Sequence, residues 1–339
     1  MMVTVGEAEN IILSQVRDYG SETVILNRCI GRVLAENILA DRDMPPYNRV
    51  TMDGIAIQYQ NIANRIIAYK IKGTQAAGED PINISQTTEC IEIMTGAALP
   101  ESLDTVIRYE DLHIENGLAT LTADPKTIIK GQNVHYKGKD RKQHDIVAKA
   151  NQLITPASIN AAATVGKSTL LVKKLPRVVI ISTGDELVNI EQIPLPFQIR
   201  SSNSATIQAA LHQYCIQADI LHIADDMQQT KAELKRCLNQ YDVILLSGGI
   251  SIGKFDYIPA ALEELSVKTL FHKVQQRPGK PFWFGTHSRG AIVFAFPGNP
   301  VSTFMCLYRY FIPWLQVSLG LVVDAKYAVL NEDLNFAPA

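Results

Sequence analysis

Four apolar runs in the second half of the chain are each followed by residues that can bind a charged ligand. These residues are Thr183-Gly184-Asp185-Glu186, Asp225-Asp226, Ser247-Gly248-Gly249 with Asp256, and Pro297-Gly298-Asn299-Pro300. Glycines let backbone N–H groups approach a phosphate. Carboxylates repel a phosphate unless a divalent cation lies between them, so the combination predicts a Mg²⁺-assisted site for a phosphorylated small molecule.

A separate polar segment, Arg277-Pro278-Gly279-Lys280-Pro281, adds positive charge that suits an oxyanion. Taken singly, each acidic residue also has a plainer interpretation as a helix cap or a turn residue. The hypothesis of a site therefore depends on the agreement of four separate strand ends.

The segment near the C-terminus predicts a strand that passes directly into a helix. Residues 291–296 are an apolar run, and Pro297-Gly298 is a turn-forming pair. Asn299 is placed as the N-cap and Pro300 as the first residue of a helix over 301–316. Free N–H groups at the start of that helix would face the turn and bind an anion, although a well-capped junction without a ligand is an equally good interpretation.

Strands alternate with helices from residue 176 onward, which predicts a mainly parallel sheet. Strands are expected at 177–182, 218–223, 243–246 and 291–296, and Asn203 or Ser204 is expected to cap a helix that ends near Tyr214. Ligands of such sheets bind beyond the carboxyl ends of the strands, where the polar segments lie. The sequence lacks a GxxxxGK[ST] P-loop, and no GxGxxG follows the first strand.

The first half of the chain predicts a β-rich, barrel-like domain that follows an unusual polar segment. Residues 41–54 hold two prolines and several charges and end at Asp53-Gly54, a turn dipeptide. They suit either a functional loop or a polar linker. Strands are expected at 66–71, 90–94, 105–109 and 118–121, and Thr95 follows the second of these. Thr95 either presents its hydroxyl at this strand end or is a buried turn threonine, and the local sequence supports both equally.

Two further pieces flank the β-rich part. Thr4 to Glu7 has capping-box spacing and opens an N-terminal helix. A helical stretch at 156–165 and a strand at 170–172 form a returning piece on which that helix is expected to pack. His135 and His144 have no partner at metal-ligand spacing, so both are interpreted as surface histidines.

The composition excludes several classes of protein. The chain has 339 residues, a net charge of -2, 47% hydrophobic and 19% charged residues, which favours two or three globular domains. A near-neutral charge argues against nucleic-acid binding. The sequence predicts neither a signal peptide nor a membrane span, and the five scattered cysteines predict reduced thiols and a cytoplasmic location.

Six motifs, taken in order, give the sequence a resemblance to a known family. They are Thr51-Met52-Asp53-Gly54, Met94-Thr95-Gly96-Ala97, Ser182-Thr183-Gly184-Asp185-Glu186-Leu187, Ser247-Gly248-Gly249-Ile250-Ser251-Ile252-Gly253 with Asp256-Tyr257, Pro278-Gly279-Lys280-Pro281 and Pro297-Gly298-Asn299-Pro300-Val301-Ser302. The chain resembles the molybdopterin molybdenumtransferases, the MoeA family that includes the E domain of gephyrin. Each motif alone is weak, but the ordered set is highly specific.

The resemblance implies an enzyme of molybdenum cofactor biosynthesis that inserts molybdenum from molybdate into adenylylated molybdopterin and releases AMP, with Mg²⁺. It implies an elongated homodimer, with a molybdopterin adenylyltransferase as a further partner, and Asp53 and Thr95 of one subunit facing the other. The implied catalytic residues are Asp53, Thr95, Asp140, Glu186, Asp225 and Asp256, and Asp225 and Asp256 would hold the metal. The implied substrate-binding residues are Gly184, Ser247, Gly248, Gly249, Ser251, Gly253, Arg277, Lys280, Pro297, Gly298, Asn299, Pro300 and Ser302.

The resemblance also predicts the domain organisation. Residues 1–41 with 141–174 would form a discontinuous linker domain, 42–140 the β-rich domain, and 175–319 a MogA-like, molybdopterin-binding α/β domain. Residues 320–339 would be a remnant of the β-rich fourth domain usual in the family. Lys139, Lys254 and Arg277 depart from the family pattern and add positive charge around the expected site.

Two other functions compete with the transferase. A molybdopterin adenylyltransferase would resemble the α/β domain alone, and the β-rich domain argues against it. A non-catalytic scaffold of the same family would have no use for three acidic loops around an anion-binding turn.

Overall fold

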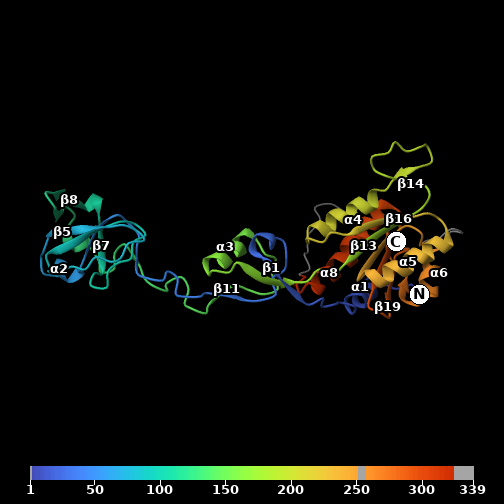
Figure 1. The fold of residues 1–339 in the computed structure, drawn as a ribbon, viewed down its shortest axis with the longest axis horizontal. Helices are drawn as coiled ribbons and strands as arrows, with labels where there is room; N and C mark the ends of the chain where they lie inside the picture. The colour runs from blue at the N-terminus through green and yellow to red at the C-terminus, as the bar shows by residue number, and fades with distance from the viewer. Residues whose placement is uncertain (1, 251–256, 324–339) are drawn as a thin grey trace. The chain divides into compact units, whose positions relative to one another are not determined.

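A computed structural model describes residues 2–250 and 257–323 (Figure 1). The chain divides into two compact units. The β-rich unit comprises Ile38–Ala148 with Thr164–Gly166, and the α/β unit comprises the remaining segments. The predicted Ser251, Gly253 and Asp256 lie outside the described residues, as does most of 320–339. The four-part domain division stays a prediction.

The β-rich unit is built on one six-stranded sheet with the order β7-β4-β6-β5-β9-β8. Its strands are β4 (Gly54–Ile57), β5 (Ala68–Gln75), β6 (Glu89–Ile93), β7 (Thr105–Arg108), β8 (Leu112–Glu115) and β9 (Leu118–Leu121). Buried isoleucines and valines of alternate positions form a separate cluster on each face of the sheet, with Ile55 and Ile57 on one and Ala56 on the other. Four of these strands match the predicted runs, whereas β4 and β8 were not predicted.

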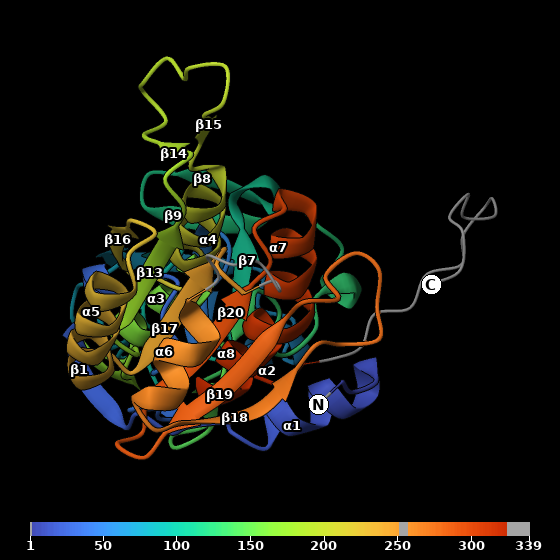
Figure 2. The ribbon, with the colours of Figure 1, turned by 90° about the vertical axis from the view of Figure 1, so that its right-hand side faces the viewer.

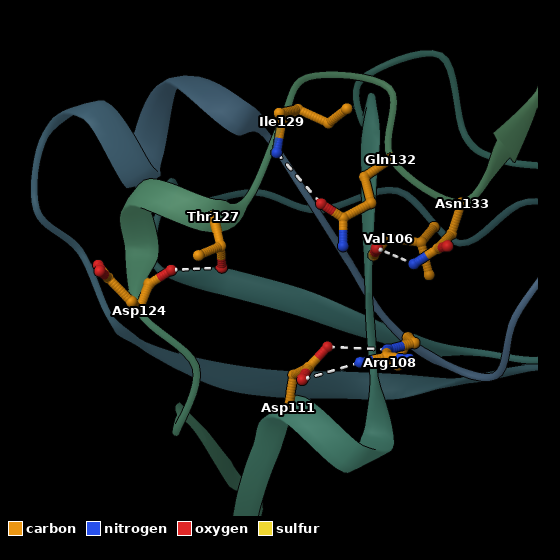
Figure 3. Close-up of polar contacts among 8 residues, drawn as sticks. All are labelled: Val106, Arg108, Asp111, Asp124, Thr127, Ile129, Gln132 and Asn133. Carbon is orange, nitrogen blue, oxygen red and sulfur yellow. Dashed lines mark hydrogen bonds and ion pairs between the residues drawn. The ribbon is translucent and has the colours of Figure 1, made fainter.

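A loop of the β-rich unit is held against strand β7 by side-chain hydrogen bonds (Figure 3). Asn133 Nδ2 donates to the carbonyl of Val106 at 2.9 Å, and Gln132 Oε1 accepts from the N–H of Ile129 at 3.1 Å. The carbonyl of Asn133 accepts from the N–H of Thr51 at 3.0 Å. This loop therefore anchors the segment that leads to Asp53.

The α/β unit contains the predicted sheet, in the order β16-β13-β17-β20-β19-β18. The parallel strands are β16 (Asp219–Ile223), β13 (Val178–Thr183), β17 (Val243–Ser247) and β20 (Ile292–Phe296), and β19 (Trp283–His287) and β18 (Val267–His272) are antiparallel. Ser182 is in register with Ser247, and Ser247 with Phe296. The polar segments after these strands consequently start at one edge of the sheet.

Helices cover both faces of this sheet, which explains why its central strands β13, β17 and β20 are buried at every position (Figure 2). On one face lie α4 (Ser202–His212), α7 (Pro300–Cys306) and α8 (Ile312–Ser318). The π-helical turn η4 (Leu307–Phe311) connects α7 to α8. On the other lie α5 (Met227–Gln240) and α6 (Ile258–Glu264). The excursion between β14 (Leu187–Val188) and β15 (Ile199–Arg200) projects away from the sheet (Figure 1).

The N-terminal helix α1 (Val5–Leu13) has the predicted capping box between Thr4 and Glu7. The expectation that it packs on the returning piece is wrong. Its buried Ala8 and Ile12 join the sheet's own core cluster beside Trp314, whose Nε1 donates to the carbonyl of Gln15 at 3.0 Å. Helix α1 packs there because it removes the apolar side of η4 and α8 from water.

The returning piece pairs instead with the strand that follows α1. Strand β1 (Ser21–Ile25) is antiparallel to β12 (Thr169–Lys173), and α3 (Pro156–Thr164) precedes β12. In the β-rich unit, β2 (Ile38–Leu39) pairs with β11 (Ile146–Ala148). None of the helices in residues 2–250 and 257–323 is both long and apolar enough to cross a membrane.

Candidate functional site

Asp53 and Thr95 form a hydrogen-bonded pair at the surface of the β-rich unit. The backbone N–H and the hydroxyl of Thr95 both donate to Asp53 Oδ1, at 2.6 and 2.8 Å. These two bonds lower the pKa of Asp53 below its ordinary value, so the carboxylate is ionised at neutral pH. The sequence expectation that Thr95 presents its hydroxyl at a strand end is therefore confirmed as geometry.

Gly54 fixes the position of Asp53 on the sheet. It starts β4 where this strand meets β7, and a Cβ at residue 54 would lie 1.8 Å from the carbonyl oxygen of Ile107. Only glycine permits this approach. The adjacent carbonyl of Asp53 accepts from the N–H of Tyr109 at 3.2 Å, so the backbone on both sides of the carboxylate is tied to the sheet.

Asp140 lies elsewhere in the β-rich unit and pairs with His135. The distance from His135 Nε2 to Asp140 Oδ1 is 2.9 Å, and the N–H of Asp140 donates to the carbonyl of Met44 at 2.9 Å. Arg141 bridges to Met44 and Val134 pairs with Val50, so Asp140 lies beside Met44, at the other end of this paired segment from Asp53. The structure therefore does not bring these two carboxylates together.

The strand ends of the α/β unit enclose a cavity of about 380 Å³. Nine of the residues implied by the resemblance line it, and they come from all four parallel strands: Gly184, Glu186, Asp225, Gly248, Gly249, Pro297, Gly298, Asn299 and Ser302. Ser247 and Pro300 line a smaller cavity next to it, which shares Gly298. The predicted convergence of the strand ends is confirmed, while the role of each residue stays a prediction.

Two glycines after β17 form one wall of the cavity. Gly248 and Gly249 have φ values of 94° and 66°, the left-handed region that favours glycine. A Cβ on Gly249 would lie 2.8 Å from Thr183 Oγ1 and 2.9 Å from Ile258 Cγ1. Ordinary side chains are thus excluded, and the backbone itself faces the ligand space.

The carboxylates of Glu186 and Asp225 line the same cavity, whereas the adjacent Asp185 and Asp226 make structural hydrogen bonds. The N–H of Asp225 donates to Asp185 Oδ1 at 3.1 Å, which ties the ends of β16 and β13 together. Asp226 caps helix α5 by accepting from the N–H of Gln229 at 2.7 Å. Of the acidic residues here, Glu186 and Asp225 therefore face the cavity, while Asp226 is a structural cap.

The start of helix α7 confirms Asn299 as the N-cap and fits the well-capped junction, one of the two interpretations that the sequence left open. The Oδ1 of Asn299 accepts from the N–H groups of both Val301 and Ser302, at 3.0 and 3.2 Å. The prediction of free N–H groups facing the turn is wrong for these two. Donors for an anion must consequently come from side chains or from other backbone positions.

Asn203 is a functional candidate that sequence reasoning misjudged. The N-cap position of helix α4 is Ser201, which makes no side-chain capping bond, and not Asn203 or Ser204. The Nδ2 of Asn203 donates instead to Ser247 Oγ at 2.8 Å and to the carbonyl of Gly298 at 2.9 Å. It thereby joins the ends of β17 and β20, which no local sequence signal indicates.

Arg277 and Lys280 are exposed and lie in a turn that is tied to η4 and α7. Tyr310 Oη donates to Gln276 Oε1, and Gln276 Nε2 donates to Cys306 Sγ at 3.3 Å. Neither Arg277 nor Lys280 is among the described residues that line the cavity, although the adjacent Pro281 is. Their predicted contact with an oxyanion stays a prediction.

The donor set fits Mg²⁺ bound together with a substrate better than a protein-only metal centre. Within residues 2–250 and 257–323, no three His, Cys, Asp or Glu side chains are grouped to hold a metal ion. Glu186 and Asp225 supply two carboxylates beside the glycine wall. Magnesium is commonly held by one or two carboxylates plus substrate phosphates, so these residues fit it.

Comparisons with known proteins give a consistent result along the chain. Residues 3–166 match the model of the MoeA N-terminal region (domain I and II), and residues 179–317 match that of a probable molybdopterin binding domain. A molybdopterin molybdenumtransferase of Synechocystis sp. is 37% identical over 99% of this chain and 85% of the relative. One from Staphylococcus aureus is 31% identical over 89% of this chain and 72% of the relative.

Solved structures agree with the sequence comparison. Two crystal structures of a molybdopterin biosynthesis MoeA protein from Pyrococcus horikoshii superpose with TM-scores of 0.82 and 0.80, at 28% and 25% identity. They cover 94% and 95% of this chain, and 81% and 80% of the solved chains.

Proposed function

The chain belongs to the molybdopterin molybdenumtransferase family, MoeA, and on this premise we propose that it inserts molybdenum from molybdate into adenylylated molybdopterin and releases AMP. The activity is that of a transferase in molybdenum cofactor biosynthesis. The structural observation that carries the proposal is the cavity where the four parallel strands end. It combines a glycine wall with two carboxylates, which suits a phosphorylated substrate and its cation.

The chain's own groups have separable tasks in this reaction. The glycine wall and Asn203 shape the space for the nucleotide phosphate, and Glu186 and Asp225 would hold Mg²⁺. When bound, Mg²⁺ would neutralise negative charge on the phosphoanhydride that is cleaved to release AMP. Asp53, fixed by Thr95, remains ionised and orients polar groups of the substrate, and Arg277 and Lys280 attract molybdate.

Chelation of divalent metal is expected to lower AMP release about 100-fold, because two carboxylates beside a phosphate repel it without a cation. Release is measured on the full chain after EDTA treatment and again after adding Mg²⁺. Glu186→Gln should raise the Mg²⁺ concentration needed for half-maximal release. Undiminished release in EDTA, with the metal content checked, would contradict the Mg²⁺ assignment.

The proposal includes a homodimer and a molybdopterin adenylyltransferase that delivers the substrate. Family membership supports both, and light scattering of the purified chain tests the dimer directly. A monomer with full activity would remove the dimer from the proposal.

The competing adenylyltransferase activity is tested with ATP and molybdopterin. An adenylyltransferase forms pyrophosphate from this pair, whereas the transferase proposed here does not. The match of residues 3–166 to the MoeA N-terminal region favours the transferase. Pyrophosphate formation at a rate similar to AMP release would overturn this choice.

A further inference from the structure

Thr183 ends strand β13 and carries a buried hydroxyl that no described residue satisfies. The residue is 8% exposed, and its Oγ1 has no hydrogen-bond partner among the described residues. A buried hydroxyl without a partner is rare and costs stability. Thr183 is also one of the residues that line the cavity at the strand ends.

Gly248 and Gly249 pack closely against this hydroxyl. An added Cβ would lie 3.2 Å from Thr183 Oγ1 if placed on Gly248, and 2.8 Å away if placed on Gly249. Gly248 in turn lies close to Gly298, whose added Cβ would be 3.7 Å from the Gly248 Cα. The hydroxyl is therefore packed against the two glycines that form one wall of the cavity.

Neighbouring hydroxyls already have hydrogen-bond partners within the protein. Ser247 Oγ accepts from Asn203, and Thr303 Oγ1 donates to the carbonyl of Pro297 at 2.6 Å. Asn299 Oδ1 accepts hydrogen bonds from the N–H groups of Val301 and Ser302. Thr183 Oγ1 thus differs from the hydroxyls of Ser247 and Thr303 in having no hydrogen-bond partner among the described residues.

We infer that Thr183 Oγ1 binds the nucleotide moiety of the substrate by donating a hydrogen bond to a phosphate oxygen. The inference rests on the proposed function, because it assigns the ligand at the same cavity. A hydroxyl is both donor and acceptor, and an anionic oxygen is its strongest partner. The free protein bears the cost of the unsatisfied group, and the ligand relieves it.

This role predicts opposite effects of one substitution on stability and on binding. Thr183→Val keeps the shape and removes the hydroxyl, so the midpoint of thermal unfolding without ligand is expected to rise by about 2 °C. The Kd for AMP, measured by calorimetry on the full chain, is expected to rise about tenfold. Thr183→Ser keeps the hydroxyl and is expected to bind AMP within about twofold of the wild type.

Thr105→Val is the matched control. Thr105 is fully buried in the β-rich unit, but its Oγ1 donates to Asp104 at 3.1 Å and accepts from the N–H of Gly131 at 3.2 Å. Its substitution is expected to lower the unfolding midpoint and to leave AMP binding unchanged.

Two results would overturn the inference alone: wild-type affinity for AMP in Thr183→Val, or a loss of stability in that variant as large as in Thr105→Val. Absence of AMP binding by the wild-type chain would overturn the proposed function together with it.

Discussion

Substituting Asp53 by asparagine is expected to lower the rate of AMP release about 100-fold or more without changing the fold of the β-rich unit. Asparagine has the size of aspartate, and its Oδ1 still accepts from the N–H and hydroxyl of Thr95, which lie 2.6 and 2.8 Å away in the wild type. Only the negative charge is lost. The measurement is steady-state AMP release, together with circular dichroism to confirm the fold.

Asp124→Asn provides the matched control for Asp53→Asn. Asp124 is in the same unit and also accepts a backbone hydrogen bond, from the N–H of Lys126 at 3.0 Å, but no motif of the family includes it. The rate of AMP release by the Asp124→Asn variant is expected to stay near that of the wild type. Turnover of Asp53→Asn within about threefold of the wild type would remove Asp53 from the active-site residues.

The second large effect is expected from Gly249→Ala. A methyl group there collides with Thr183 Oγ1 and Ile258 Cγ1, and the backbone conformation itself disfavours a side chain. Strain and overpacking together are expected to lower the free energy of unfolding by about 3 kcal/mol. The variant is also expected to lose measurable AMP binding, because the methyl group pushes the wall into the ligand space. Urea denaturation and calorimetry measure the two effects.

Gly20→Ala separates backbone strain from collision. Gly20 has a similar positive φ of 82°, but an added Cβ would meet no heavy atom within 4 Å. The Gly20→Ala substitution is expected to lower the free energy of unfolding by only about 1 kcal/mol and to leave AMP binding unchanged. Equal destabilisation by the two substitutions would show that space at Gly249 does not matter.

Much of the α/β unit could be predicted because its central strands are fully buried. Strands β13, β17 and β20 are apolar runs with polar residues only at the carboxyl ends of β13 and β17, and the turn-forming residues after them mark the strand ends clearly. Parallel pairing then brings those ends to one edge, so the convergence of Gly184, Gly248 and Gly298 followed from the pattern. The cap at Asn299 was predictable for the same local reason.

Contacts between distant segments could not be read from the sequence. Asn203 looks like a helix cap, and its bonds to Ser247 and Gly298 depend on how two strand ends are spaced across the sheet. The packing of α1 on α8 joins residues about 300 positions apart, as in the bond from Trp314 to Gln15. Periodicity marks the apolar side of a helix but does not identify the surface that covers it.

Thr183 shows a further limit of sequence reasoning. It is part of a recognised motif, yet nothing in that motif distinguishes a hydroxyl with a partner from one without. The distinction appears only when the positions of Gly248 and Gly249 are known. Unsatisfied buried groups are therefore found from the structure and not from the motif.

The central claim is that this chain releases AMP from adenylylated molybdopterin as it inserts molybdenum. The most direct test follows AMP release by the purified 339-residue chain with Mg²⁺, in the presence and absence of molybdate. Release that depends on molybdate and is accompanied by equimolar molybdenum bound to the pterin is the predicted result. Tight nucleotide binding with no release under either condition would contradict the claim.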